Sequence, residues 1–338
     1  MRAFIQRGVR GPRIGHCLAW LMLAAVALDQ LAFAESDPLL GNLLLQPAVQ
    51  QRQPAGSMIL AAKAAGKRIV AVGEQGTVLL SDDNGQTFRQ AIGVPVRTQL
   101  NGLQFIDEQT GWAVGHGGVV LRTDDGGEHW ALQRSDFDVD RPLFSVYFRD
   151  RNEGWAVGLW SLMLHTTDGG KRWVSVSLPP LPDGRRPDLN LFSLFGDHSG
   201  NLFVAGERGM VLRSTDGGNA WSYVATGYQG SLWAGAAADD GTLLVGGLRG
   251  ALFRSTDAGG HWTAVALGQS SSIVSIFARG ERVYAVGLDG LQLTSADHGR
   301  SFKLQRQADR LAMTAAVPTA SGALVAFSKS GVVSAPAR

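Results

Sequence analysis

A short motif recurs six times along this chain, and its spacing constrains the fold more than any other feature. Four copies have the form S/T-x-D-x-G-x-x-W, as in LRSTDGGNAW at 212–221, and two looser copies end in Phe. Successive copies start 40 to 48 residues apart, counted between the Asp residues Asp83, Asp125, Asp168, Asp216, Asp257 and Asp297. Self-similarity at such a period indicates a fold built from repeated supersecondary units.

A second repeated feature lies upstream of each Asp motif. A glycine stands ten residues before every motif Asp, and in most repeats it closes a short apolar run and opens a G-x-x-G turn; the glycines are Gly73, Gly115, Gly158, Gly206, Gly247 and Gly287. A further apolar run, such as LNGLQFID at 100–107, precedes it. Short apolar runs separated by Gly and Asp turns predict four strands per repeat and no helix.

Four antiparallel strands every 40 to 45 residues predict an all-β fold, a seven-bladed β-propeller. Six repeats are complete, and ALVAFSKSG at 323–331 begins a seventh that ends before its Asp motif. We expect residues 35–57, and NLLLQPAVQQ at 42–51 in particular, to supply a strand that closes this last blade. The propeller itself is expected to span residues 58–338. Six blades with a separate C-terminal tail is the alternative.

The Asp motif has a structural interpretation and two functional alternatives. An Asp in a tight turn accepts hydrogen bonds from nearby backbone N–H groups, Gly supplies the positive φ, and the Trp or Phe packs at the seam between blades. A metal site needs several converging carboxylates, and glycoside hydrolysis needs a pair roughly 5–9 Å apart. Because each turn offers only one such Asp, we expect a structural role for all six, and no metal or cofactor.

The motif resembles the Asp-box (BNR) repeat of sialidases and sortilin-type receptors. The longer phrase GWAVGxxGxVLRTxDGGxxW, at 111–130 and slightly altered at 154–173, resembles the photosystem II stability/assembly factor family. That resemblance covers nearly all of residues 58–338. It implies a seven-bladed propeller of the thylakoid lumen, with related exported proteins in non-photosynthetic bacteria.

The first 34 residues have the order of a secretory signal peptide. Four Arg precede an apolar run, and Ala32 and Ala34 stand before an expected cut at Glu35. A retained membrane anchor is the alternative. This segment holds four Arg, one Asp and the one cysteine, so the rest of the chain carries a net charge of about −1 and no thiol. A basic surface for nucleic acid is therefore not indicated. We expect an exported, monomeric protein of the periplasm, or of the thylakoid lumen in a photosynthetic host.

An enzyme is not expected. A sialidase-like site needs an Arg triad, a Tyr nucleophile with a Glu partner and an Asp acid, and no such set is apparent. The four Tyr are Tyr147, Tyr223, Tyr228 and Tyr284, and three of them fall within expected strands. A glycan-binding or glycan-cleaving propeller is retained as the alternative function.

A partner surface is expected on the face opposite the Asp motifs, where the turns between second and third strands meet the links between blades. Arg is frequent there, and its planar guanidinium binds carboxylates with two hydrogen bonds. The link LPPLPDGRRPDLN at 178–190 forms a stiff, Pro-rich arm. The candidate partner-binding residues are Arg97, Arg141, Trp160, Arg185, Arg186, Arg208 and Arg249. A solvated surface with no partner is the alternative. We expect a non-catalytic scaffold that binds a membrane protein complex, or an acidic or C-terminal segment of an exported protein.

Overall fold

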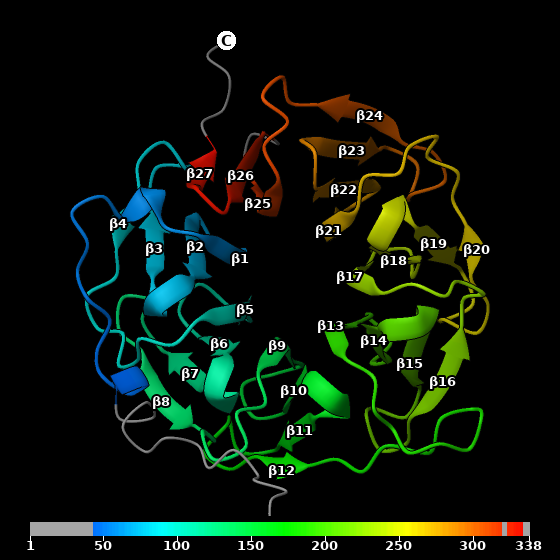
Figure 1. Ribbon diagram of the computed structural model, residues 1–338, viewed down its shortest axis with the longest axis horizontal. Helices are drawn as coiled ribbons and strands as arrows, with labels where there is room; N and C mark the ends of the chain where they lie inside the picture. The colour runs from blue at the N-terminus through cyan, green and yellow to red at the C-terminus, as the bar shows by residue number, and fades with distance from the viewer. Residues whose placement is uncertain (1–42, 320–322, 334–338) are drawn as a thin grey trace, which may run out of the picture. The chain divides into compact units, whose positions relative to one another are not determined.

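The strands of the protein are grouped into seven antiparallel sheets that follow one another along the chain. The computed structural model describes residues 43–319 and 323–333, and the expected signal peptide lies outside these residues. We number the sheets as blades 1 to 7 in chain order. The seven-bladed propeller predicted from the repeats is confirmed, and the six-bladed alternative is wrong (Figure 1).

The first three blades contain the strands β1 (Ile59–Ala65), β2 (Arg68–Gly73), β3 (Val78–Ser81) and β4 (Arg89–Gln90); β5 (Leu100–Phe105), β6 (Gly111–Gly115), β7 (Val120–Thr123) and β8 (Ala131–Arg134); and β9 (Leu143–Phe148), β10 (Gly154–Gly158), β11 (Met163–Thr166) and β12 (Val174–Ser175). Blades 4 and 5 contain β13 (Leu191–Gly196), β14 (Leu202–Gly206), β15 (Met210–Ser214) and β16 (Ser222–Ala225), then β17 (Leu232–Ala237), β18 (Leu243–Gly247), β19 (Leu252–Ser255) and β20 (Thr263–Ala264). Blade 6 contains β21 (Ile273–Arg279), β22 (Arg282–Gly287), β23 (Leu291–Ser295) and β24 (Lys303–Arg306), and blade 7 contains β25 (Met313–Pro318), β26 (Leu324–Ser328) and β27 (Gly331–Val333).

Short 3₁₀ turns complete the inventory of elements. The first, η1 (Pro54–Gly56), precedes blade 1. In five blades the turn between the second and third strands is of this kind: η2 (Glu74–Gly76), η3 (His116–Gly118), η4 (Leu159–Ser161), η5 (Glu207–Gly209) and η6 (Leu248–Gly250). No helix among the described residues is long and apolar enough to cross a membrane.

The core is divided among the seams between blades. Seven clusters of buried apolar side chains occur among the described residues, one at each seam. Trp112 and Phe148, for example, stack with ring centroids 3.5 Å apart between blades 2 and 3. The second strand is buried throughout in every complete blade, apart from its first residue in β2 and β22. The apolar faces of each blade are buried by the two adjacent blades. The first and last blades therefore need each other, and the fold depends on a closed ring.

Among the described residues, blade 7 joins blade 1 by apolar packing and not by a shared strand, and η1 lies against β27. Blade 7 has three strands among the described residues. The closing strand expected from residues 35–57 is wrong for the described part of that segment, because residues 43–57 form no strand. This segment instead follows the outer edge of blade 1, where Ala48 N–H donates to the carbonyl of Val94 (2.9 Å) and Arg97 Nε donates to that of Pro47 (2.8 Å). Residues 35–42 lie outside the described part of the chain.

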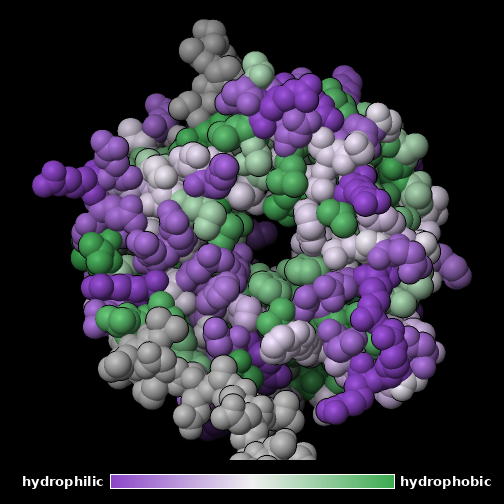
Figure 2. Space-filling model, in the orientation of Figure 1, coloured by the Kyte–Doolittle hydropathy of each residue, from purple (hydrophilic) through white to green (hydrophobic). Residues whose placement is uncertain are grey.

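The first strands of the blades surround a central channel (Figures 1 and 2). These are β1, β5, β9, β13, β17, β21 and β25, and each contacts its two neighbours in this order around the ring. Each first strand carries a bulge at its second residue. Polar side chains tie the strands together: Asn101 Nδ2 donates to the carbonyl of Leu143 (2.9 Å), and Ser145 Oγ accepts from the N–H of Leu194 (3.0 Å).

Candidate functional site

The Asp motifs form hydrogen-bonded turns on one face of the ring. In the first copy, Asp83 Oδ1 accepts from Ser81 Oγ (2.8 Å) and from the N–H groups of Gln86 (3.0 Å) and Thr87 (2.9 Å). Ser81 Oγ in turn accepts from the N–H of Gly85 (2.8 Å). Thr87 Oγ1 donates to the other carboxylate oxygen, Asp83 Oδ2 (2.5 Å). The hydrogen bonds to Asp83, led by those from Thr87, lower its pKa to about 2. The carboxylate is therefore charged and engaged in its own turn.

The other five motif Asp residues have the same arrangement. Each accepts a hydrogen bond from the hydroxyl two residues earlier and from backbone N–H groups of the same turn. Their pKa values are all lowered. No group of three or more acidic, His or Cys side chains that could bind a metal is found among the described residues. These contacts support the structural role we expect for the six Asp residues.

The opposite face carries the 3₁₀ turns η2–η6, and we call it the turn face. The first residue of each turn donates to the carbonyl just before the first strand of the same blade, as Glu74 N does to Met58 O (3.0 Å) and Leu159 N to Pro142 O (3.0 Å). The turns therefore stand around one mouth of the channel. Figure 2 shows a mixed surface around the opening, with hydrophobic residues directly beside it and hydrophilic residues farther out.

The middle residue of each 3₁₀ turn has a left-handed backbone. In η3 this residue is Gly117, for which such a conformation is unstrained (φ 64°). The equivalent residues in η4, η5 and η6 are Trp160 (φ 51°), Arg208 (φ 56°) and Arg249 (φ 54°). A non-Gly residue in this region costs of order 1–3 kcal/mol, and such strain concentrates at functional sites. Three candidate partner-binding residues thus occupy positions where glycine would be more stable.

Trp160 is the one exposed tryptophan in the described part of the chain, with 59% of its surface accessible. Its turn is fixed to the end of the 178–190 arm. Trp160 N–H donates to Asn190 Oδ1 (3.1 Å), and Ser161 N–H donates to the carbonyl of Leu189 (2.7 Å). Asn190 also bonds Glu207 through its own N–H (3.0 Å) and Nδ2 (2.9 Å). The hydrogen bonds therefore couple the Trp160 turn to the Arg208 turn.

The arm, η5 and the link after β16 enclose a pocket of about 230 Å³. Arg185, Arg208 and Tyr228 line it, together with Leu181 and Met210. Tyr228 Oη donates to the carbonyl of Leu248 (2.8 Å), which joins the pocket to the turn that carries Arg249. The floor is apolar and the rim is charged, as in many binding sites for polypeptide side chains.

Neighbouring carboxylates neutralise part of the expected positive charge. Arg185 pairs with Asp183 (2.7 Å), and Arg208 lies 3.5 Å from Asp188. The pair with Arg185 is the main reason that the pKa of Asp183 is lowered. Arg186 and Arg249 are exposed and have no ion pair among the described residues, so their charges are free to meet a partner.

The structure brings together most, but not all, of the seven candidate partner-binding residues. Trp160, Arg185, Arg186, Arg208 and Arg249 lie on blades 3 to 5 of the turn face. Arg141 adjoins them, because the carbonyl of the next residue, Pro142, bonds the η4 turn. Arg97 lies in the link between blades 1 and 2, where it binds the N-terminal segment. The role of Arg97 seen here is thus intramolecular.

Comparison with known proteins agrees with the propeller fold. Residues 90–189 match the sequence model of the family described as Photosynthesis system II assembly factor YCF48. This part of the chain is therefore similar to that family over blades 2 and 3. No curated protein sequence matches the chain significantly.

Solved structures share the fold at low sequence identity. A structure described as YCF48 bound to D1 peptide has a TM-score of 0.65 and 19% identity, over 85% of this chain and 97% of that one. YCF48 from Cyanidioschyzon merolae has a TM-score of 0.65 and 17% identity over the same shares. An ancestral GH74 enzyme has a TM-score of 0.60 and 14% identity, over 76% of this chain and 39% of that one. At these identities the likeness shows the fold alone.

Two features of the site were missed in the sequence. One is the set of carboxylates, Asp183 and Asp188, that pair with the Arg residues; their positions two or three residues from Arg185 and Arg186 were visible, but not their orientation. The other is Lys63, which interrupts the small apolar run of β1 and lies in the channel. The sequence signal for it is that Lys63 is the one charged residue in the apolar run LAAKAAG at 60–66.

Proposed function

We propose that this protein is a non-catalytic scaffold that binds an extended polypeptide segment of a membrane protein complex on its turn face. The binding surface is the part of blades 3 to 5 that presents Trp160, Arg186 and Arg249 around the 230 Å³ pocket. The observation that carries the proposal is the left-handed backbone at Trp160, Arg208 and Arg249, which places two exposed side chains and one pocket-lining side chain on the turn face at a cost in stability.

The comparisons support the class of partner. The family model that matches residues 90–189 describes an assembly factor of photosystem II, and one structure with the same fold is described as bound to D1 peptide. A polypeptide segment with aromatic and acidic side chains suits this surface, because Trp and Arg dominate binding energy at protein interfaces. Export to the periplasm, or to a thylakoid lumen in a photosynthetic host, would place the scaffold beside exported segments of such a complex.

The test is affinity capture with the tagged protein and solubilised membranes of the source organism, followed by rebinding of each captured partner to purified variants. We expect the triple variant W160A/R186A/R249A to lose its partners. The matched control is K171A/R300A, which removes two exposed cations from the Asp-motif face. Equal capture by both variants would refute the proposed face, and turnover of a glycoside panel by the purified protein would refute the non-catalytic assignment.

A further inference from the structure

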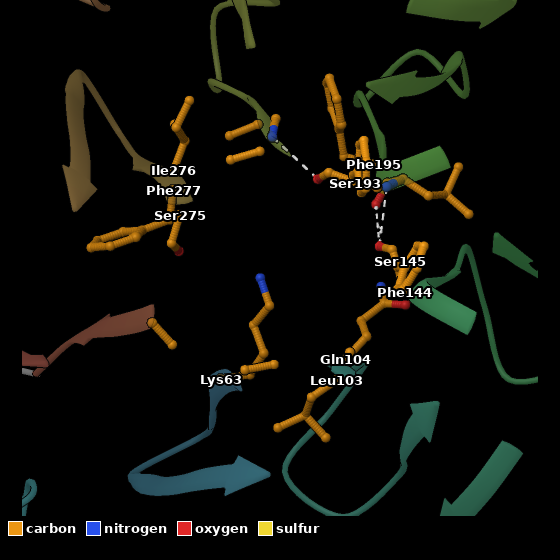
Figure 3. A pocket seen from close by; sticks show the side chains of 18 of the residues that line it. Lys63, Leu103, Gln104, Phe144, Ser145, Ser193, Phe195, Ser275, Ile276 and Phe277 are labelled. Carbon is orange, nitrogen blue, oxygen red and sulfur yellow. Dashed lines mark hydrogen bonds between the residues drawn. The ribbon is translucent and has the colours of Figure 1, made fainter. Parts of the chain in front are cut away.

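The central channel contains one charged side chain among its described lining residues, Lys63 on β1. Figure 3 shows its ammonium group directed into the open space, away from the strand that carries it. No Asp or Glu lines the channel, and Lys63 has no hydrogen bond or ion pair in the described part of the chain. The channel therefore presents an unpaired cation in a cavity of about 350 Å³.

An unpaired charge in this position is unfavourable for the protein alone. The strands around the channel remove part of the water that would surround a free ammonium group. This desolvation lowers the pKa of Lys63 from its usual value. Equivalent positions on neighbouring strands, set by the strand pairing, hold uncharged residues such as Gln104 and Phe195. The propeller therefore does not require a cation at this level of the channel.

The channel mouth on the turn face has a different chemistry. The bulge residues of three successive first strands are Phe144, Phe192 and Trp233, and all three line the cavity. Phe144 and Phe192 stack with centroids 5.7 Å apart. Lys63 stands three residues beyond the bulge position on its own strand, about 10 Å deeper at the usual rise of a strand.

Small residues separate the aromatic mouth from the cation. The position directly after the bulge is Ala61, Gly102, Ser145, Ser193, Ala234, Ser275 or Ala315 around the ring. These side chains leave the cavity open between the two levels, and Ser145 and Ser275 lie on its wall in Figure 3. The channel is thus lined by aromatic side chains at the mouth, by small side chains below them, and by the single cation Lys63 deeper inside.

We propose that the channel is a binding site for a carboxylate attached to an aromatic or apolar body. The body packs between Phe144, Phe192 and Trp233, and the carboxylate accepts a charge-assisted hydrogen bond from Lys63 Nζ. Such a carboxylate comes either from a free small molecule or from the C-terminus of a polypeptide whose last side chain is aromatic. This site is separate from the turn-face surface proposed above and does not depend on it.

The test uses 3-phenylpropionate as the probe and isothermal titration calorimetry as the measurement. We expect the protein from residue 35 to residue 338 to bind 3-phenylpropionate. The uncharged 3-phenylpropionamide should bind at least about 10-fold more weakly. Lys63→Met is expected to weaken 3-phenylpropionate binding about 10- to 100-fold, and Lys63→Arg to retain most of it. The melting temperature of Lys63→Met should be equal to or above that of the wild type, because an unpaired charge is removed.

A peptide arm distinguishes the two sources. A hexapeptide ending in Phe is compared with the same peptide carrying a C-terminal amide. Tight binding of the free peptide alone assigns the site to a chain end, and binding of 3-phenylpropionate as well assigns it to a small molecule. Equal affinity of wild type and Lys63→Met for every carboxylate, or no binding by either at millimolar concentration, would overturn the proposal. Trp160→Ala should leave all these affinities unchanged.

Discussion

Phe88 and Phe327 meet edge to face across the seam between blades 1 and 7, with ring centroids 5.6 Å apart and an interplanar angle of 81°. Phe327 is fully buried, and the same seam holds Ile59, Leu79 and Val317. Because blade 7 has only three strands among the described residues, this seam joins the two ends of the propeller chain largely by apolar packing.

We therefore expect Phe327→Ala to destabilise the protein by about 3–5 kcal/mol, the usual cost of truncating a buried Phe. The measurement is urea unfolding followed by tryptophan fluorescence. Val174→Ala is the control, because Val174 is an exposed residue of the outer strand β12. A loss no larger than that of the control would show that the ring is held closed by something other than this seam.

The ring architecture could be predicted from the sequence, but its closure could not. A glycine ten residues before each motif Asp fixes the phase of the first six blades, since the turn at that point needs the same backbone each time. The segment at 43–51 contains apolar residues, yet Leu43 and Val49 are more than half exposed and Pro47 lacks the N–H that a paired strand requires. The sequence shows that residues 43–51 are partly apolar. It does not show that they pack along blade 1, because that depends on contacts with residues such as Val94, far away in the chain.

For the candidate site, the positions of the residues could be predicted from the sequence, but the pairing of their side chains could not. Repeat position placed Trp160, Arg208 and Arg249 at equivalent turns, because the period assigns each residue to a face. The pairing of Arg185 with Asp183 depends on side-chain rotamers, which the repeat does not encode. The charge available to a partner was overestimated for this reason.

The Asp motif predicts a defined dependence of stability on pH. The folded pKa of Asp83 is about 2, below its usual value of 3.8, so its contribution to stability is present above about pH 4 and is lost as the pH falls through 2. We expect Asp83→Asn to be less stable than wild type at pH 7 and the difference to disappear near pH 2. Urea midpoints at pH 7, 4, 3 and 2 measure it. A difference that stays constant with pH would show that the carboxylate charge is unimportant for the turn.

Arginines on the third strands connect successive blades. Arg213 Nε donates to the carbonyl of Ala258 in the next Asp-motif turn (2.6 Å), and Arg254 Nε donates to that of His298 in the turn after it (3.0 Å). We expect Arg213→Met to cost about 1–3 kcal/mol, because a partly buried carbonyl loses a charged donor.

Hydrogen exchange should detect the same change locally, as faster exchange of amides in the turn at 255–262. Arg172→Met is the control, since Arg172 is largely exposed and its one ion pair among the described residues is with Asp168 of its own turn. If both variants unfold at the same urea concentration, the contact between Arg213 and Ala258 contributes nothing to cohesion between blades.

Trp160→Gly separates stability from binding at the turn face. Glycine adopts the left-handed backbone of this position (φ 51°) without strain, and the exposed indole contributes little to the core. We expect the variant to be as stable as wild type or about 0.5–1 kcal/mol more stable, while its affinity for the partner falls at least about 10-fold. Thermal unfolding and rebinding of a captured partner measure the two effects. Gly117→Trp puts an indole on the same left-handed backbone in blade 2, where its Cβ also collides with the Phe137 ring, so it should lower stability without creating partner binding. A loss of stability in Trp160→Gly would instead assign Trp160 to the structure of the propeller.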